Sequence, residues 1–124
     1  MATKFYKCNH CGNVIEKIVD SKVPVFCCGE KMEELIPNTV EASGEKHIPV
    51  VTQLQDNILK IEVGSVHHPM LPEHHIAFIY VETEHGGIRI DLKDQPVAVV
   101  HLGEEKAVAV YEYCNLHGLW KVEL

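Results

Sequence analysis

The sequence has no long apolar run and few basic residues. No stretch approaches the roughly 18 consecutive apolar residues of a membrane-spanning helix, and Met1-Ala2-Thr3-Lys4 lacks the apolar core of a secretory signal. We therefore expect a cytoplasmic protein with no membrane partner. Lys and Arg number 11 against 18 Asp and Glu, which gives a net charge of −7. Because binding to phosphate backbones requires a basic surface, this charge argues against nucleic acid as the main partner.

The chain also lacks heptads, internal repeats and any convincing long helix. Short apolar runs with a two-residue period take their place, most clearly where Ile88 and Ile90 alternate with Arg89 and Asp91. Turn-forming residues separate these runs at regular spacing. Predicted strands cover residues 59–63, 76–81, 88–92, 97–101, 107–113 and 119–124, within a set of about seven that begins near residue 47. The pattern predicts an all-β protein with an immunoglobulin-like antiparallel sandwich.

Residues 1–37 differ in composition and form a separate small domain in our interpretation, followed by the sandwich domain at 38–124. A chain of about 37 residues cannot bury enough surface to fold alone, because domains below roughly 40 residues usually need disulfides or a bound metal. Four of the five cysteines lie in this segment. The odd number of cysteines and the adjacent pair Cys27-Cys28 disfavour a disulfide framework in a cytoplasmic protein. We therefore expect a bound metal ion to stabilise this small domain.

The four N-terminal cysteines have the spacing of a four-thiolate metal site. Cys8 and Cys11 are separated by two residues, and Cys27 and Cys28 are adjacent. Gly12 allows the first pair to sit in a turn whose amides point at sulfur. Four thiolates suit zinc and iron equally, so the ligands alone do not choose between them. His10, between the first two cysteines, is interpreted as a solvated turn residue.

A second group of ligand-type side chains involves the C-terminal half. Cys114 stands alone, with His117 three residues later and Gly118 beside it. Among the nine histidines, His47, His68 and His74 lie next to prolines or in loop-like segments. One thiolate with four imidazoles is not the closed tetrahedron of structural zinc, and it suits iron with one open position. His85 and His101 are interpreted as ordinary surface histidines.

These segments resemble known families. Cys8, Cys11, Cys27 and Cys28 match the ligand pattern of desulforedoxin, in which the metal is a single iron. Segments 45–50, 63–70, 73–74 and 112–121 look like the signature segments of desulfoferrodoxin, the two-iron class of superoxide reductase. The combined resemblance covers essentially the whole chain. It implies two iron ions per chain, one bound by four cysteines and one bound by four histidines and a cysteine.

The resemblance assigns the second iron site residue by residue. Its equatorial imidazoles fall on His47, His68, His74 and His117, and its axial thiolate falls on Cys114. His67 and His75 stand next to the family's ligand positions, at places where the family usually has a residue other than histidine. Either member of the pairs His67-His68 and His74-His75 therefore remains a possible ligand. His68 is preferred because it precedes Pro69-Met70, and His74 because it lies four residues after Met70.

The same resemblance implies an activity: one-electron reduction of superoxide to hydrogen peroxide, without dismutation to oxygen. Lys46 would attract the anion and orient water, which matters in a chain of net charge −7. Glu45 is similar to the family carboxylate that occupies the sixth position after oxidation. A rubredoxin-like electron donor and a homodimer are also implied. The amides of Asn115 and Leu116 could bind the Cys114 sulfur and tune the iron.

Three alternatives to a superoxide reductase remain open at this point. The first is an electron carrier in which only the four-thiolate iron cycles; Cys114 and its histidines would then have no use. The second is a structural or regulatory zinc protein, because zinc does no redox chemistry. The third is a cupin-type oxygenase, although that site uses no axial cysteine. Tyr111, Tyr113 and Trp120 are interpreted as core or interface residues rather than electron relays.

Overall fold

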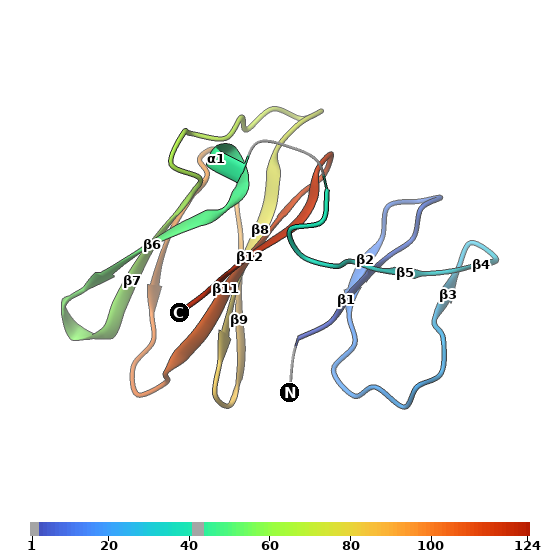
Figure 1. The fold of residues 1–124 in the computed structure, drawn as a ribbon, viewed down its shortest axis with the longest axis horizontal. Helices are drawn as coiled ribbons and strands as arrows, with labels where there is room; N and C mark the ends of the chain where they lie inside the picture. Colours follow the sequence, from blue (N-terminus) through green and yellow to red (C-terminus); the bar gives the residue numbers. More distant parts are fainter. Residues whose placement is uncertain (1–2, 41–43) are drawn as a thin grey trace. The chain divides into compact units, whose positions relative to one another are not determined.

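The computed structural model describes residues 3–40 and 44–124, without the side chain of Glu45. Contacts within the chain divide it into two compact units, Met1–Ile36 and Pro37–Leu124. We call these the small unit and the sandwich unit (Figure 1). The division falls one residue before the boundary that the sequence suggested. In the described ranges, no helix has the length and apolar character needed to cross a membrane.

The small unit consists of short strands around a very small core. Its strands are β1 (Phe5–Lys7), β2 (Val14–Glu16), β3 (Phe26–Cys27), β4 (Glu30–Lys31) and β5 (Glu33–Glu34). They form a sheet of order β2-β1-β5 and a β3-β4 hairpin. Phe5, Cys8 and Met32 are the buried hydrophobic residues among those described in this unit, whereas Ile18 and Val19 are more than 80% exposed. So little burial agrees with a unit that needs a metal staple.

The sandwich unit contains seven strands in two antiparallel sheets (Figure 1). The strands are β6 (Pro49–Leu54), β7 (Ile58–Val63), β8 (Ile76–Thr83), β9 (Gly86–Asp91), β10 (Val97–His101), β11 (Ala107–Cys114) and β12 (Gly118–Glu123). The sheet orders are β10-β7-β6 and β12-β11-β8-β9. One helical turn, α1 (Gly44–His47), precedes β6, and a 3-10 turn, η1 (Gln55–Asn57), follows it. The all-β, antiparallel prediction is confirmed.

The core of the sandwich unit follows from alternation along the strands. In β7, Leu59, Ile61 and Val63 are buried, and they pack in one cluster with Ile79 of β8 and Val110 of β11. Full burial of each such side chain contributes about 1.5–3 kcal/mol. The nearly all-apolar segment at 76–81 is β8, which lies between β11 and β9 as an internal strand. Its continuous apolar run reflects this internal position.

The pairing register brings several strand ends together at one end of the sandwich unit. Pro49, the first residue of β6, pairs with Val63, the last residue of β7. Cys114, the last residue of β11, pairs with both Gly118 at the start of β12 and Ile76 at the start of β8. The segments that connect these strand ends therefore meet at this end. They include α1, residues 64–75 and residues 115–117.

A close approach in the β8-β9 hairpin makes one glycine necessary. A Cβ atom at Gly87 would overlap the ring and hydroxyl of Tyr80, which is buried on β8. We expect Gly87→Ala to lower the free energy of unfolding by about 1–3 kcal/mol, because overpacking forces a buried ring to shift. Chemical denaturation measures this loss. In a Tyr80→Leu background the same glycine substitution should cost less, and an equal cost in both backgrounds would contradict the overlap.

Candidate metal centres

Five side chains meet at the end of the sandwich unit where the strand ends converge. One donor atom from each of the five lies within 4.8 Å of all the others; the residues are His47, His68, His74, Cys114 and His117. The Nε2 atom of His47 lies 3.1 Å from Nε2 of His68 and 3.1 Å from Nδ1 of His117. Nitrogens held at right angles, each about 2.1 Å from a metal, lie about 3.0 Å apart. The spacing therefore fits imidazoles around a common centre.

The four imidazole rings form a closed cycle. Neighbouring ring centroids lie 4.7 Å apart for His47 and His68, 4.6 Å for His68 and His74, 5.1 Å for His74 and His117, and 4.9 Å for His117 and His47. Each neighbouring pair is T-shaped, with interplanar angles of 69° to 85°. Four rings in this order describe a square with one nitrogen at each corner.

The sulfur of Cys114 lies on the axis of this square. It is 3.4 Å from Nε2 of His68 and 3.9 Å from Nδ1 of His117. These two histidines are opposite members of the cycle, and the donor atoms of His47 and His74 also lie within 4.8 Å of the sulfur. A sulfur close to all four nitrogens lies over the square rather than beside an edge. The donor set is therefore a square of nitrogens with one axial thiol, which leaves the opposite axial direction without a donor from these five residues.

Local sequence explains how each segment presents its histidine. His47 is the last residue of α1, and Pro49 starts β6 two residues later, which disfavours continuation of the helix through Ile48. His117 lies in the three-residue turn between β11 and β12, where Gly118 has φ of +80°, a conformation that favours glycine. Nδ1 of His68 lies 2.7 Å from the Pro69 carbonyl. Donation of Nδ1–H to that oxygen leaves the Nε2 lone pair for the cluster.

Burial favours the neutral, metal-binding form of two of the four imidazoles, those of His68 and His74. His47 and His68 are buried, and burial lowers the pKa of His68 to about 4. Burial also lowers the pKa of His74, whose buried Nε2 atom has no hydrogen-bond partner among the described residues. A metal ion would satisfy that atom, because polar atoms without partners are costly in a protein interior. The donor set therefore fits a transition metal.

The Cys114 thiol is fully buried, and burial raises its pKa. The amides of His117 and Leu116 oppose this effect by hydrogen bonding to the sulfur. The sequence suggested Asn115 and Leu116 as the amide donors, which is right for Leu116 and wrong for Asn115. The Asn115 amide instead donates to the His75 carbonyl, at 3.2 Å. A bound cation would supply the remaining stabilisation that a buried thiolate needs.

Trp120 contacts two of the five residues. Its ring stacks on His47 with centroids 4.9 Å apart and an interplanar angle of 18°. Its indole N–H donates to the His117 carbonyl at 3.1 Å. Trp120 is thus a core residue, as the sequence suggested, and it also packs directly against the cluster.

Glu112 is a buried acid beside the cluster, and sequence reasoning assigned it no role. Both of its carboxylate oxygens lack a hydrogen-bond partner among the described residues, and burial raises its pKa to about 9. It lies two residues before Cys114 on β11 and is fully buried. The only signal in the sequence is a single carboxylate within the apolar run of β11.

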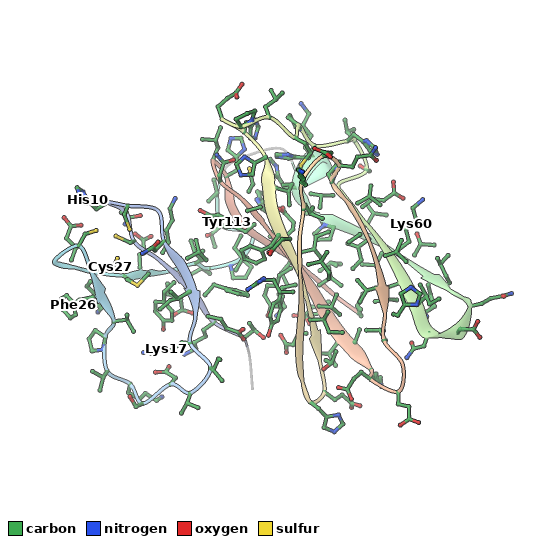
Figure 2. All side chains as sticks on the ribbon, turned by 180° about the vertical axis from the view of Figure 1, so that it is seen from behind. His10, Lys17, Phe26, Cys27, Lys60 and Tyr113 are labelled. Carbon is green, nitrogen blue, oxygen red and sulfur yellow. The ribbon has the colours of Figure 1, made fainter. Side chains whose placement is uncertain are left out.

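The four cysteines of the small unit form a second cluster. Their sulfur atoms all lie within 4.8 Å of one another, and Figure 2 shows Cys27 among other sulfur atoms. The sulfur of Cys27 is 3.6 Å from that of Cys11 and 4.0 Å from that of Cys28. Four sulfurs about 2.3 Å from one metal lie about 3.8 Å apart in a tetrahedron. The distances fit such a site and are far too long for disulfides.

Backbone conformation explains how adjacent cysteines reach one centre. Cys28 has φ of +55°, in the left-handed region, and Gly29 follows with φ of +75°. In an extended strand, adjacent side chains point to opposite sides. The turn at Cys28 and Gly29 instead allows the Cys27 and Cys28 side chains to converge. In the first pair, the amide of Cys11 donates to the Cys8 sulfur at 3.4 Å, as expected for the turn before Gly12.

The thiols of this cluster differ in acidity. Amide hydrogen bonds, first that of Cys11, lower the pKa of Cys8 to about 6. The neighbouring Cys11 side chain raises the pKa of Cys28 to about 12. Several thiolates this close repel one another, so the cluster cannot be fully ionised without a cation. A metal ion would provide that cation.

Three described residues that the sequence also singled out, His67, His75 and Lys46, belong to neither cluster. His67 is exposed, 3.8 Å from Glu62, and Nδ1 of His75 lies 3.0 Å from the Leu71 carbonyl. The structure thus brings His68 and His74 into the cluster and leaves their neighbours out. Lys46 is exposed on α1, and its charge contributes to lowering the pKa of His74. The side chain of Glu45 lies outside the described part of the structure.

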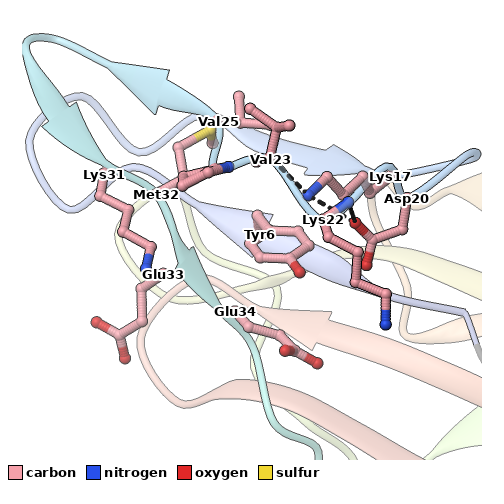
Figure 3. Close-up of a pocket in the computed structure, with 11 residues that line it drawn as sticks. Tyr6, Lys17, Asp20, Lys22, Val23, Val25, Lys31, Met32, Glu33 and Glu34 are labelled. Carbon is pink, nitrogen blue, oxygen red and sulfur yellow. Dashed lines mark hydrogen bonds and ion pairs between the residues drawn. The ribbon is translucent and has the colours of Figure 1, made fainter.

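The small unit also has an open hollow, of about 520 Å³, that shares no residue with the cysteine cluster. Figure 3 shows Tyr6 in this hollow, with the Lys17 ammonium donating to the Val23 carbonyl at 2.8 Å. Lys17 also pairs with Asp20 at 2.9 Å, and this contact holds the pKa of Asp20 well below its usual range. These interactions close the 17–23 loop.

Together, the fold and the two clusters define a class: small all-β proteins with a four-cysteine unit and a sandwich that gathers four imidazoles and one thiol. Comparison with known proteins is consistent with this class. The family model of desulfoferrodoxin matches residues 39–123. The chain belongs to the desulfoferrodoxin family.

Individual relatives extend the similarity over both units. The chain is 42% identical to the desulfoferrodoxin of Syntrophotalea carbinolica, covering 95% of this chain and 94% of that protein. It is 40% identical to the desulfoferrodoxin of Nitratidesulfovibrio vulgaris, over 97% and 95% of the two chains. The crystal structure of the superoxide reductase from Treponema pallidum is similar, with a TM-score of 0.82, 32% identity and coverage of 99% and 100%.

Proposed function

We propose that this protein is a superoxide reductase, which converts superoxide to hydrogen peroxide by adding one electron and two protons, without dismutation to oxygen. The observation that carries the proposal is the square of four imidazoles with the Cys114 sulfur on its axis. Relatives of the chain named superoxide reductase support it. The donor set leaves one axial direction for a small anion.

We propose iron at both centres. Cys8, Cys11, Cys27 and Cys28 would hold one ion, and His47, His68, His74, Cys114 and His117 would hold the other. Iron in the sandwich unit would supply the electron that superoxide takes up. The axial thiolate of Cys114 would donate electron density and favour release of that electron. Five donors with a square of nitrogens are unlike the closed tetrahedron of structural zinc, which argues against the zinc alternative at this site.

Lys46 and Glu45 act on the substrate side in this proposal. The Lys46 ammonium is exposed beside the His47 ligand and attracts the anion, which a net charge of −7 otherwise repels. Its Nζ also orients a water molecule that delivers protons. Glu45 would supply a carboxylate ligand to the iron once it is oxidised, as its resemblance to the family carboxylate implies. An electron carrier that uses only the four-cysteine site would require neither these residues nor Cys114.

Lys46→Ala should slow the reaction with superoxide about 10-fold at low ionic strength, because local steering typically changes association rates by at least that factor. It should also weaken the salt dependence of the rate. Pulse radiolysis at several ionic strengths measures both effects. Lys60→Ala is the matched control, since Lys60 is an exposed lysine of β7 whose loss changes the net charge equally. Equal rates for the two variants would remove Lys46 from the mechanism.

Anaerobic rapid mixing of the reduced protein with superoxide tests the activity itself. The expected result is a fast absorbance transient, a thiolate-to-iron charge-transfer band and about one peroxide per oxidised iron of the sandwich site. If peroxide is not formed and only the spectrum of the four-cysteine site changes, an electron carrier is the better account. Metal analysis that finds zinc in both sites would support a structural zinc protein.

A rubredoxin-like electron donor, a homodimer and a cytoplasmic location complete the proposal. The exposed apolar side chains of the small unit, among them Val19 and Phe26, support association with a second copy. Sedimentation equilibrium of the iron-loaded protein tests the dimer. Reduction of the oxidised enzyme by a purified rubredoxin tests the donor.

A further inference from the structure

The Asn115 side chain connects the end of β11 to the loop that carries His74. The His75 amide donates to Asn115 Oδ1 at 2.8 Å, and Asn115 Nδ2 donates to the Glu73 carbonyl at 3.0 Å. The Asn115 amide donates to the His75 carbonyl at 3.2 Å. All three hydrogen bonds reach the two residues on either side of His74, and Asn115 itself directly follows Cys114.

His74 needs such support more than the other three histidines. His68 is oriented by the Pro69 carbonyl, His47 stacks on Trp120, and the His117 carbonyl accepts the Trp120 indole N–H. The buried Nε2 of His74 has no hydrogen-bond partner among the described residues. Apart from a single bridge between Leu71 and His74, residues 68–75 form no strand or helix. The direction of the imidazole therefore depends on how the backbone of residues 73–75 is held.

We propose that Asn115 is a positioning residue, which fixes the His74 imidazole relative to the Cys114 sulfur and thereby couples an equatorial ligand to the axial ligand. This inference rests on the proposed function only in requiring that the five donors bind iron. Because Asn115 and Cys114 are adjacent in the chain, a shift of the His74 loop cannot occur without breaking hydrogen bonds to the residue next to the axial thiol.

Two substitutions separate the hydrogen bonds of the Asn115 side chain. Asn115→Asp keeps an oxygen that can accept from the His75 amide, but it loses the donor to the Glu73 carbonyl. Asn115→Ala loses both. In the iron-loaded, full-length protein, we expect release of sandwich-site iron to a ferrous chelator to be about 10–100-fold faster in Asn115→Ala, as for loss of other outer partners of metal ligands. The aspartate variant should fall between the alanine variant and the wild type.

Iron release is followed as two phases, and the phase that Cys114→Ser removes is assigned to the sandwich site. The four-cysteine phase should be unchanged in both Asn115 variants. The thiolate-to-iron charge-transfer band should persist at a shifted wavelength. Cys114 still binds the iron, while the arrangement of the four imidazole ligands around it changes. This spectroscopic change separates an effect on the ligand square from a general loss of stability.

Asn57 offers a matched control in the same unit. Its side-chain amide donates to the carbonyls of Gly103 at 2.8 Å and Glu105 at 2.9 Å, so it also ties a loop to the sandwich. It precedes the start of β7, whereas the cluster follows the opposite end of that strand. Asn57→Asp should lower the melting temperature while leaving iron release and the charge-transfer band unchanged.

A double-mutant cycle shows whether Asn115 acts through His74. In a His74→Ala background, Asn115→Ala should produce no further acceleration of iron release. An additive effect, or wild-type release from Asn115→Ala alone, would overturn the proposal. Failure of the proposed function is separately visible: a wild-type protein that holds iron but does not reduce superoxide would still show the Asn115 effect.

Discussion

Cys114→Ser is expected to abolish superoxide reduction while the four-cysteine site of the small unit stays filled. The loss should exceed the factor of about 100 that follows removal of an outer-shell partner, since the axial donor itself is replaced. A serine hydroxyl at this fully buried position is a poor ligand for iron and donates far less electron density than a thiolate. Rapid mixing with superoxide measures the rate, and the thiolate-to-iron band should disappear with it.

The reciprocal variant controls for a general effect of replacing cysteine. Cys11→Ser removes an exposed member of the other cluster, so the four-thiolate spectrum should be lost while superoxide reduction is retained. Substantial activity in Cys114→Ser would refute the assignment of its sulfur as the axial ligand. Loss of activity in both variants would mean that the four-cysteine iron takes part in turnover.

Cys8→Ser should unfold the small unit and leave the sandwich unit intact. Cys8 is the buried member of its cluster and accepts the Cys11 amide, so its loss removes both a ligand and part of the minimal core. Binding of a structural metal to four such ligands contributes about 10–16 kcal/mol in small zinc domains. That is comparable with the whole stability of about 5–15 kcal/mol of a typical domain. The unit should therefore not persist without its metal.

Limited proteolysis and metal analysis measure this outcome. Cleavage should become rapid within residues 3–36, and about one iron per chain should be lost, while the spectrum of the sandwich site is kept. Asn9→Ala is the control, because Asn9 lies in the same turn, is not one of the four cysteine ligands, and donates its side-chain amide to the Glu33 carboxylate at 2.9 Å. Loss of both irons in Cys8→Ser would contradict the independence of the two units.

Most strands of the sandwich unit could be predicted because one face of each is buried. Val97–His101 was predicted with the bounds that the structure has, β7 and β9 follow from their apolar alternation, and β8 follows from its nearly continuous apolar run. β6 has no such signal: only Pro49 is buried, and most of the strand is exposed at the edge of its sheet. Its pairing with β7 makes it a strand, and this pairing is a tertiary property. The two-residue strands of the small unit are too short for any periodicity.

The five donors of the sandwich cluster could be proposed from the sequence because motifs around them carry a family resemblance. The structure places donor atoms of His68 and His74 in the cluster, whereas His67 and His75 contact other partners. The residues that hold the donors in place could not be predicted in the same way. Asn115 and Trp120 act through contacts with chain segments up to about 70 residues away, and single-sequence patterns do not encode these contacts.

The separation of the donors along the chain has a consequence for maturation. Cys8 and Cys27 are 19 residues apart, whereas His47 and His117 are 70 residues apart. Contacts between distant residues form late in folding, and a chain emerges from the ribosome with its N-terminus first. The cysteine site can therefore acquire its metal while the rest is still being synthesised. The histidine site needs His117, which follows β11, so we expect its ion to bind only after most of the sandwich unit has formed.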